Sequence, residues 1–278
     1  MSNRTVPIGL IAGNGVFPLL VLRAARAIGH EMTVVAIRGE ASAEIDALAR
    51  ELGGASVTWI ELGQLERCLA TFAGTGVTRA VMAGQVKHVK LFGDVRPDPT
   101  LAAALSRLGA QNTDALIAAV AGVLESRGIA LMDSTTLLSS LLAKPGNLTR
   151  ARPSAAMRAD FEFGHAAADA IAGIDVGQTI VVKDRAVVAV EAMEGTDAAI
   201  ARGGALAGPG TRVVKVAKPA QDMRFDVPVV GVRTIEAMRQ AGCDGLAIDA
   251  GRTLVLDGDA FVQAADSAGL VVVARERP

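Results

Sequence analysis

The first half of the chain alternates short apolar segments rich in β-branched residues with longer segments rich in Ala and Leu. The short segments are apolar almost throughout, which is typical of strands buried on both faces, and the longer ones resemble helices in length and composition. A parallel sheet covered by helices on both faces has this pattern. We therefore predict a Rossmann-like domain with strands at 8–12, 32–37, 57–62, 80–83 and 129–132 and helices at 19–28, 43–52, 65–72, 99–108 and 113–126.

The second half has a different pattern, because two predicted strands follow each other without a helix between them. Residues 179–183 and 186–192 are joined at Asp184-Arg185, which indicates a tight antiparallel hairpin. We therefore predict an α+β domain with a mixed sheet. Its further strands are expected at 212–216, within 245–256 and at 271–274, and its helices at 154–172, from 197, at 234–241 and at 258–268.

Proline and glycine mark the connection between the two halves. Pro145, Gly146 and Pro153 break helical continuity, and a chain of 278 residues has room for two domains of about 150 residues each. The predicted class is therefore α/β, with a first domain at 1–143, a linker at 144–153 and a second domain at 154–278.

Composition excludes several classes of function. Hydrophobic residues make up 51% and charged residues 21%, as in ordinary globular proteins, and a net charge of -1 argues against a nucleic-acid partner. No run of about 18 apolar residues is present, so we expect a cytoplasmic protein. Cys68 and Cys243 are too far apart in sequence for a metal-thiolate motif and are expected as core thiols. The sequence contains neither a nucleophile-elbow motif nor a P-loop motif.

Two stretches of the chain contain cations and no carboxylate. Arg67, Arg79, Lys87 and Lys90 lie in the first, between Glu66 and Asp94. The second, between Asp133 and Asp160, has four cations: Lys144, Arg150, Arg152 and Arg158. Each stretch is consistent with solvated surface charge. Their joint placement, after a parallel strand and between the predicted domains, favours an anionic ligand.

A glycine loop follows the first predicted strand. Gly13, Asn14 and Gly15 stand where a backbone can approach a ligand and where a helix N-terminus can bind an anion. A simple turn is the alternative interpretation. Pro18 replaces the third glycine of the dinucleotide motif, and Arg38 stands where an NAD enzyme has an acid. NAD is therefore disfavoured, which leaves an NADP-dependent oxidoreductase as an alternative function.

Acidic and basic residues are interleaved in two segments of the second half. Carboxylates in small number beside cations fit Mg²⁺ shared with substrate phosphates. Simpler roles remain open: Asp197 as a helix cap, Glu191 as an outward-facing strand residue, Asp226 as a turn acid and Arg224 as the partner of a neighbouring acid. The acids are Glu191, Glu194, Asp197, Asp222 and Asp226, and the cations are Lys215, Lys218 and Arg224.

Four segments carry a resemblance to a known family. They are residues 12–18, 175–178, 190–197 and, most specifically, 215–228. In this order they resemble the bacterial UDP-2,3-diacylglucosamine pyrophosphatases of lipid A synthesis, a family unrelated to the calcineurin-like metallophosphoesterases. This chain departs from the family at Phe17-Pro18, where Leu-Pro is usual, and at Gly84-Gln85-Val86-Lys87, where a Lys-Val pair usually follows the glycine.

The resemblance implies a Mg²⁺-dependent attack of water on the pyrophosphate of UDP-2,3-diacylglucosamine, giving UMP and 2,3-diacylglucosamine 1-phosphate. The first domain is then expected to bind substrate and the second to be catalytic. A non-catalytic module that binds a nucleotide sugar or a lipid is a further alternative. The expected catalytic residues are Asp226, Asp222, Arg224 and Lys218, and the expected metal ligands are Glu191, Glu194, Asp197, Asp222 and Asp226. The expected substrate-binding residues are Gly13, Asn14, Gly15, Gln85, Lys87, Gln178, Thr196 and Lys215.

The acyl chains of such a substrate need shielding from water, which costs about 0.8 kcal/mol per exposed CH₂ group. The Ala- and Leu-rich segments 100–108, 115–124 and 137–142 are predicted to supply an apolar surface for them. The same argument allows peripheral contact with the inner membrane.

Overall fold

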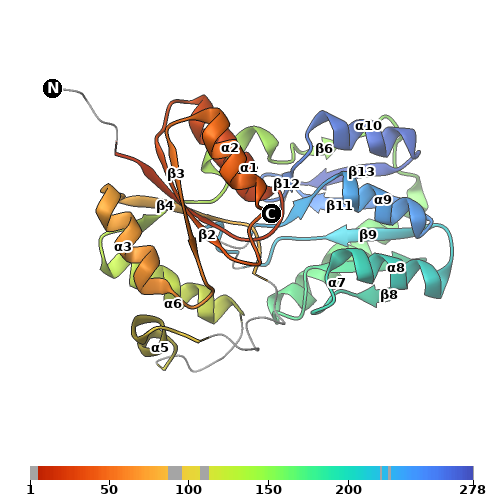
Figure 1. The fold of residues 1–278 in the computed structure, drawn as a ribbon. Coiled ribbons are helices and arrows are strands. Elements are labelled where there is room, and N and C mark those ends of the chain that lie inside the picture. The colour runs from red at the N-terminus through yellow and green to blue at the C-terminus, as the bar shows by residue number, and fades with distance from the viewer. Residues whose placement is uncertain (1–5, 87–95, 107–112, 220, 225–226, 278) are drawn as a thin grey trace. The chain divides into compact units, whose positions relative to one another are not determined.

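The computed structural model describes residues 6–86, 96–106, 113–219, 221–224 and 227–277 (Figure 1). The chain divides into two compact units, residues 1–138 and 139–278. Each unit contains its own sheet, so each is described by itself.

The first unit has a five-stranded sheet in the order β3-β2-β1-β4-β5, with every pair of neighbours parallel. This confirms the predicted Rossmann-like architecture, and the switch in strand order lies between β1 and β4. The strands are β1 (Ile8–Ala12), β2 (Met32–Ile37), β3 (Ala55–Ile60), β4 (Arg79–Ala83) and β5 (Ala130–Leu131). The helices are α1 (Phe17–Ala27), α2 (Glu44–Leu52), α3 (Leu65–Thr75), α5 (Pro99–Leu105) and α6 (Thr113–Ser126).

The helices of the first unit form two groups. α1 contacts α2, whereas α3 contacts α5 and α5 contacts α6. Right-handed crossovers place two such groups on opposite faces of a sheet with this strand order. α1 begins at Phe17, two residues before the predicted start, because Pro18 lies in the first turn, where a missing N–H group costs no hydrogen bond.

The second unit has a six-stranded sheet in the order β6-β13-β11-β9-β7-β8. β9, β11 and β13 are parallel, whereas β6, β7 and β8 pair with their neighbours in antiparallel fashion, which confirms the predicted mixed sheet. The strands are β6 (Gly146–Asn147), β7 (Thr179–Lys183), β8 (Ala186–Val190), β9 (Thr211–Lys215), β11 (Cys243–Asp249) and β13 (Val271–Arg275). β10 (Val229–Val230) and β12 (Leu254–Val255) form a separate parallel pair.

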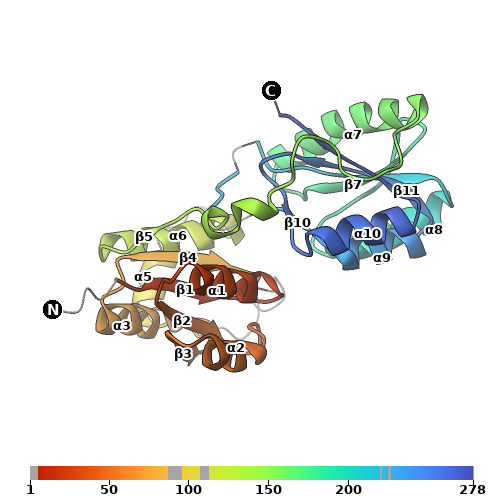
Figure 2. The same ribbon diagram turned by 90° about the horizontal axis from the view of Figure 1, so that it is seen from above.

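Helices cover both faces of the second sheet (Figure 2). α7 packs on β7 and β9, and its Met157 and Phe161 contribute to the core on that face. Three helices cover the opposite face, the middle one in contact with both others, with Ile235, Met238 and Phe261 in the core beneath them. The four helices are α7 (Ala155–Gly173), α8 (Thr196–Ala207), α9 (Val232–Gln240) and α10 (Asp259–Ser267).

The segment 144–153, expected as a linker, contributes β6 to the second sheet. Asn147 of β6 pairs with Val273 of β13, and the backbone N–H of Val272 donates to Thr149 Oγ1. The 3-10 helix η1 (Thr136–Leu141) precedes this segment and is kinked at Leu138, where the two units divide. Prediction from the sequence missed β6 because two residues are too few to show a periodicity.

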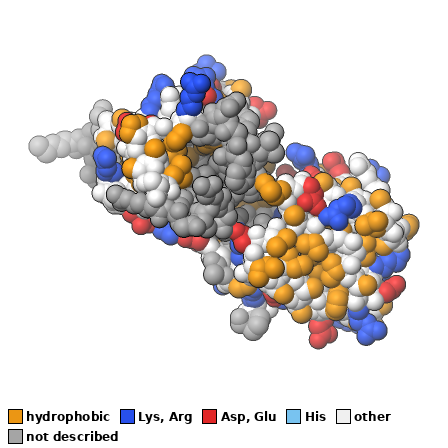
Figure 3. Space-filling view, turned by 90° about the horizontal axis from the view of Figure 1, so that it is seen from below, with side chains coloured by type: hydrophobic (Ala, Val, Ile, Leu, Met, Phe, Trp, Pro, Cys, Tyr) orange, Lys and Arg blue, Asp and Glu red, His pale blue; other side chains and the backbone are white. Residues whose placement is uncertain are grey.

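The second unit exposes part of its apolar surface. Figure 3 shows hydrophobic side chains gathered on one face of this unit. β8 is an edge strand, and Val187 on it is exposed. Among the described helices, none combines the length and apolar character that a membrane span requires.

Both cysteines lie in the hydrophobic cores, as predicted. Cys68 in α3 and Cys243 at the start of β11 are free and buried. Burial raises the pKa of Cys68 to about 12, so its thiol is protonated and unreactive at neutral pH.

Candidate active site

Several chemically active residues meet at one edge of the second sheet. β8, β9, β11 and β13 run in the same direction, so their carboxyl ends lie at the edge where the antiparallel β7 begins. Thr179 at the start of β7 pairs with Lys215 at the end of β9, and the N–H of Glu191 donates to the carbonyl of Thr179. The register therefore brings Glu191, Thr179 and Lys215 into one row.

Thr196 connects the two charged members of this row. Its hydroxyl, at the first residue of α8, donates to Glu191 Oε1 at 2.8 Å and accepts from Lys215 Nζ at 2.9 Å. Lys215 is only 6% exposed, and among the described residues no carboxylate forms an ion pair with it. A buried ammonium group without a direct counter-ion among the described residues is costly, so an anionic group beside it would be stabilising.

Three polar atoms beside this row lack hydrogen-bond partners among the described residues. They are Gln178 Oε1, Thr179 Oγ1 and Glu191 Oε2, and all three atoms are buried. Such atoms are uncommon in native proteins and call for a bound group or water. We call Gln178, Thr179, Glu191, Thr196 and Lys215 the edge cluster. Four of its members were predicted site residues, and Thr179 was missed because an apolar strand pattern gives no sign of it.

Gly177 permits the close approach of β7 to the end of β8. A Cβ atom at this position would lie 2.0 Å from the carbonyl oxygen of Glu191. No side chain fits there, so the glycine of the 175–178 segment sets the position of Gln178 and Thr179 beside Glu191.

Asp249 is a second buried acid at this edge that sequence analysis missed. It is the last residue of β11 and is fully buried, and its Oδ2 accepts from the backbone N–H of Ala217 at 2.8 Å. Its Oδ1 accepts from Arg275 Nε at 2.6 Å. Asp249 therefore fixes the start of the loop that carries Lys218 and Asp222. An acid at the end of an otherwise apolar strand is the signal that could have identified it.

Two arginines, the last residue of β13 and one just beyond it, complete this network. Arg275 and Arg277 each donate to Asp169 of α7 at 2.8 Å, and Arg277 also donates to the backbone carbonyls of Ala217 and Lys218. Charge-assisted bonds of this kind hold a loop more firmly than neutral ones. The network thus ties the loop at 217–218 to both α7 and the end of the sheet.

Lys218 points toward Asp175, another residue that was not predicted. The two side chains form an ion pair of 2.7 Å, and the backbone N–H of Lys218 donates to Gln221 Oε1 at 2.8 Å. These contacts hold the predicted catalytic lysine beside the 175–178 segment that contains Gly177.

Asp222 and Arg224 pair with each other, which agrees with the simpler role for Arg224 as the partner of a neighbouring acid. Arg224 Nη2 lies 2.7 Å from Asp222 Oδ2, and the hydrogen bonds from Arg224 lower the pKa of Asp222. The carboxylate is therefore ionised well below neutral pH. Asp226, the residue most strongly implied by the resemblance, lies outside the described residues.

The remaining predicted metal ligands, Glu194 and Asp197, have arginine partners. Glu194 Oε1 accepts from Arg202 at 2.6 Å, which lowers the pKa of Glu194, and Asp197 lies 3.7 Å from Arg233. The part of the chain that the structure describes contains no group of three or more His, Cys, Asp or Glu side chains suited to a metal ion. Asp197 lies in the first turn of α8, whose N-cap residue is Gly195, so Asp197 is not the cap of this helix.

The glycine loop of the first unit lies at the switch in strand order. It follows β1, and Asn14 bridges to Gln85 after β4, with the Asn14 N–H donating to the Gln85 carbonyl at 2.7 Å. A Cβ at Gly13 would lie 2.7 Å from the Gln85 carbonyl oxygen, so this glycine serves the chain's own packing. Gly15 has a φ of +87°, and no described atom lies within 4 Å of the place that a Cβ would take, so its backbone is open to a ligand.

Two further residues of the first unit are Lys87, an expected substrate contact, and Arg38, which stands where an NAD enzyme has an acid. Lys87 lies outside the described residues. Arg38, at the end of β2, pairs with Glu61 at 3.5 Å and lies 5.9 Å from the ring of Trp59. Its guanidinium group therefore already has local partners.

Comparison with known proteins places the whole chain in one family. Residues 7–141 match the family model of the LpxI N-terminal domain, and residues 144–273 match that of the LpxI C-terminal domain. The chain belongs to the LpxI family. It is 32% identical to the UDP-2,3-diacylglucosamine pyrophosphatase LpxI of Caulobacter vibrioides, over 98% of this chain and 99% of that protein.

The two LpxI domains correspond closely to the two compact units. The domain matches meet between residues 141 and 144, and the units divide between 138 and 139. The edge cluster belongs to the LpxI C-terminal domain, and the Gly13–Gln85 contact belongs to the LpxI N-terminal domain.

Proposed function

We propose that this protein hydrolyses the pyrophosphate bond of UDP-2,3-diacylglucosamine, releasing UMP and 2,3-diacylglucosamine 1-phosphate. The match to an LpxI pyrophosphatase over 98% of the chain carries this proposal, because it includes both units. The buried cation of the edge cluster supports it independently, since a pyrophosphate is an anion that needs such a partner.

Lys215 is proposed to bind the phosphoryl oxygens. Its ammonium group is held by Thr196 and is buried, so its electrostatic effect on a developing negative charge is strong and needs little reorganisation. Lys218 and Arg224 are proposed to add positive charge from the adjoining loop. Gln178 is proposed to bind substrate through the side-chain oxygen that has no partner among the described residues.

We propose Mg²⁺ as the cofactor, held by one or two carboxylates together with the substrate phosphates. Among the described carboxylates, Glu191 fits this role best, because its Oε2 is buried and unpartnered there. Glu194 and Asp222 fit less well, since arginine occupies each of them. The ion would neutralise charge on the phosphoryl group, while Asp226 is proposed, on the resemblance alone, as the acid that activates water or binds the metal.

In the first unit, we propose that Gly15, Asn14, Gln85 and Lys87 contact the substrate. The open backbone at Gly15 and the uncapped N-terminus of α1 support an anion contact there. The two acyl chains are proposed to lie on apolar helices of the protein. We also propose a cytoplasmic location with contact at the inner membrane, because transfer of acyl chains through water is costly.

The decisive experiment measures UMP release from UDP-2,3-diacylglucosamine with Mg²⁺, with and without a chelator. We expect hydrolysis that stops when the chelator is added. Asp226→Ala and Asp222→Ala should both reduce turnover in folded protein, with the larger loss at Asp226. Binding without turnover would identify a non-catalytic module, whereas tight NADP binding with no hydrolysis would favour an oxidoreductase.

A further inference from the structure

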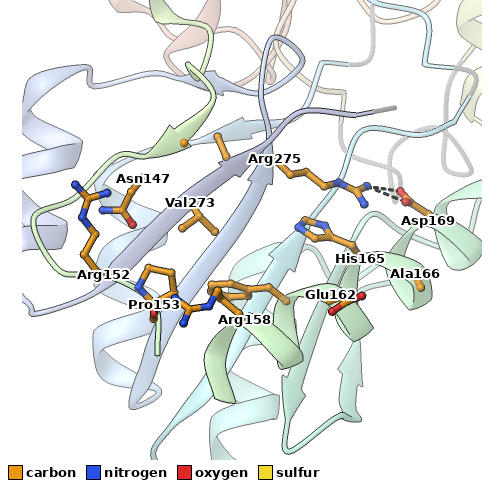
Figure 4. A pocket seen from close by; sticks show the side chains of 13 residues that line it. Asn147, Arg152, Pro153, Arg158, Glu162, His165, Ala166, Asp169, Val273 and Arg275 are labelled. Atoms are coloured by element: carbon orange, nitrogen blue, oxygen red, sulfur yellow. Dashed lines mark hydrogen bonds and ion pairs between the residues drawn. The ribbon is translucent and has the colours of Figure 1, made fainter. Parts of the chain in front are cut away.

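A pocket of about 830 Å³ lies in the second unit between α7 and the strands β6 and β13 (Figure 4). Phe161 from α7 and Val273 from β13 form its apolar lining, whereas the side chain of Ala274 belongs to the core on the opposite face of the sheet. The volume is typical of sites for small organic ligands. Of the described residues in the network around Asp249, Asp169 and Arg275 line the pocket, and the described lining contains no member of the edge cluster.

The two ends of the pocket differ in how their charges are balanced. Arg275 at one end is paired with Asp169 and Asp249. Arg152 and Arg158 lie toward the other end, near Pro153, and neither forms an ion pair with a described carboxylate (Figure 4). Arg158 donates instead to the carbonyl of Pro153. This second end therefore presents two arginines whose charges the described chain does not neutralise directly.

Two neutral polar side chains also line the pocket, His165 between these ends and Asn147 beside Arg152 (Figure 4). His165 points from α7 into the space before β13 and is 9% exposed, and its Nδ1 has no partner among the described residues (Figure 4). Burial, reinforced by Arg275, lowers the pKa of His165 to about 4, so the ring is uncharged at neutral pH. Asn147 Oδ1 is likewise buried and unpartnered there. The remaining carboxylate of the lining, Glu162, lies one helical turn from Arg158 without forming an ion pair with it.

We propose that this pocket binds an amphiphilic anion: a carboxylate or phosphate monoester attached to a short alkyl chain. The anionic group would bind Arg152 and Arg158, and guanidinium groups suit both head groups because of their paired donors. The alkyl chain would pack on Phe161 and Val273. This inference does not depend on the proposed hydrolase activity, because it concerns a different set of residues.

Calorimetric titration of the full-length protein tests the proposal, with probes kept below their critical micelle concentrations. We expect decyl phosphate or decanoate to bind. Decanol, which lacks the anionic group, and inorganic phosphate, which lacks the alkyl chain, should bind at least ten-fold more weakly. The comparison of decyl phosphate with decanoate then identifies the preferred head group.

Variants locate the site. Arg152→Gln combined with Arg158→Gln should weaken binding of the charged probe at least ten-fold, and Ala166→Trp, in the lining, should prevent it by filling the pocket. Arg150→Gln and Ala170→Trp are matched controls, because neither residue lines the pocket and both are exposed. Both controls should bind as the native protein does. Thermal unfolding of each variant confirms that it is folded. If the double variant does not fold, binding is measured with Arg152→Gln alone.

Three results would overturn the proposal. They are the absence of binding to either charged probe, equal affinity for decanol and decyl phosphate, and unchanged affinity in the arginine variants. Hydrolysis of the nucleotide-sugar lipid is measured separately. A lack of probe binding therefore leaves the proposed hydrolase function standing, and a lack of hydrolysis leaves the pocket proposal standing.

Discussion

At the scale of single residues, the buried ammonium group of Lys215 has the clearest predicted effect. Lys215→Met keeps the length of the side chain and removes its charge, so the fold should survive while turnover falls about 10²–10³-fold, as for other lost electrostatic donors. Steady-state kinetics of UMP release measures this loss.

Lys183→Met is the matched control for that variant. Lys183 ends β7 at the opposite edge of the same sheet, where it donates to the carbonyls of Ala207 and Pro209. Turnover should stay close to native in this variant. Equal losses of turnover in both variants would mean that Lys215 affects turnover only by stabilising the fold.

The pKa of His165 predicts a pH dependence of stability. Its pKa is lowered to about 4 in the folded protein from the ordinary histidine value of 6.5, so the unfolded chain binds more protons between these values. The contribution of His165 to the free energy of unfolding is therefore fully present above pH 6.5 and is lost as the pH drops toward 4. The loss between pH 7.5 and pH 5 should be about 2 kcal/mol.

Urea unfolding of native protein and His165→Gln at these two pH values measures that loss. The variant should show a smaller decrease in the free energy of unfolding on acidification, because it has no imidazole to protonate. An identical decrease in both proteins would mean that other groups account for the acid sensitivity.

At the scale of elements, the approach of β7 to the end of β8 depends on Gly177. A methyl group there would meet the Glu191 carbonyl, so Gly177→Ala should displace the start of β7, lower the melting temperature and reduce turnover. Thermal unfolding and kinetics are measured on the same preparation.

Gly173→Ala is the matched control for this element. Its added Cβ would make only an ordinary contact, 3.7 Å from Pro219, at the end of α7. This variant should unfold and react as the native protein does. If Gly177→Ala also unfolded and reacted as the native protein does, the close approach of β7 to the Glu191 carbonyl would not be needed for stability or turnover.

At the scale of the whole molecule, the position of the unit boundary can be tested with fragments. Residues 139–278 contain a complete six-stranded sheet with helices on both faces, so this fragment should unfold cooperatively. A fragment of residues 154–278, which begins at the boundary predicted from the sequence, lacks β6 and Thr149. It should therefore have a lower melting temperature by circular dichroism. Equal melting temperatures would show that β6 adds nothing to the second unit.

The order of the elements along this chain was largely determined by local sequence. Burial on both faces requires continuous apolar strands, so the predicted bounds of β1, β2 and β7 agree with the structure to the residue. The family was also accessible from the sequence, because the segment 215–228 resembles it specifically and the domain matches confirm the resemblance.

Only the tertiary structure decided which of these residues act together. Strand order places Thr179, Lys215 and Glu191 in one row, and periodicity along the chain carries no information about strand order. The same holds for Asp249, whose partners Ala217 and Arg275 are 32 and 26 residues away along the chain. The sequence therefore identified the kinds of side chain that the chemistry needs, whereas packing of the sheet determined which of them can reach the same ligand.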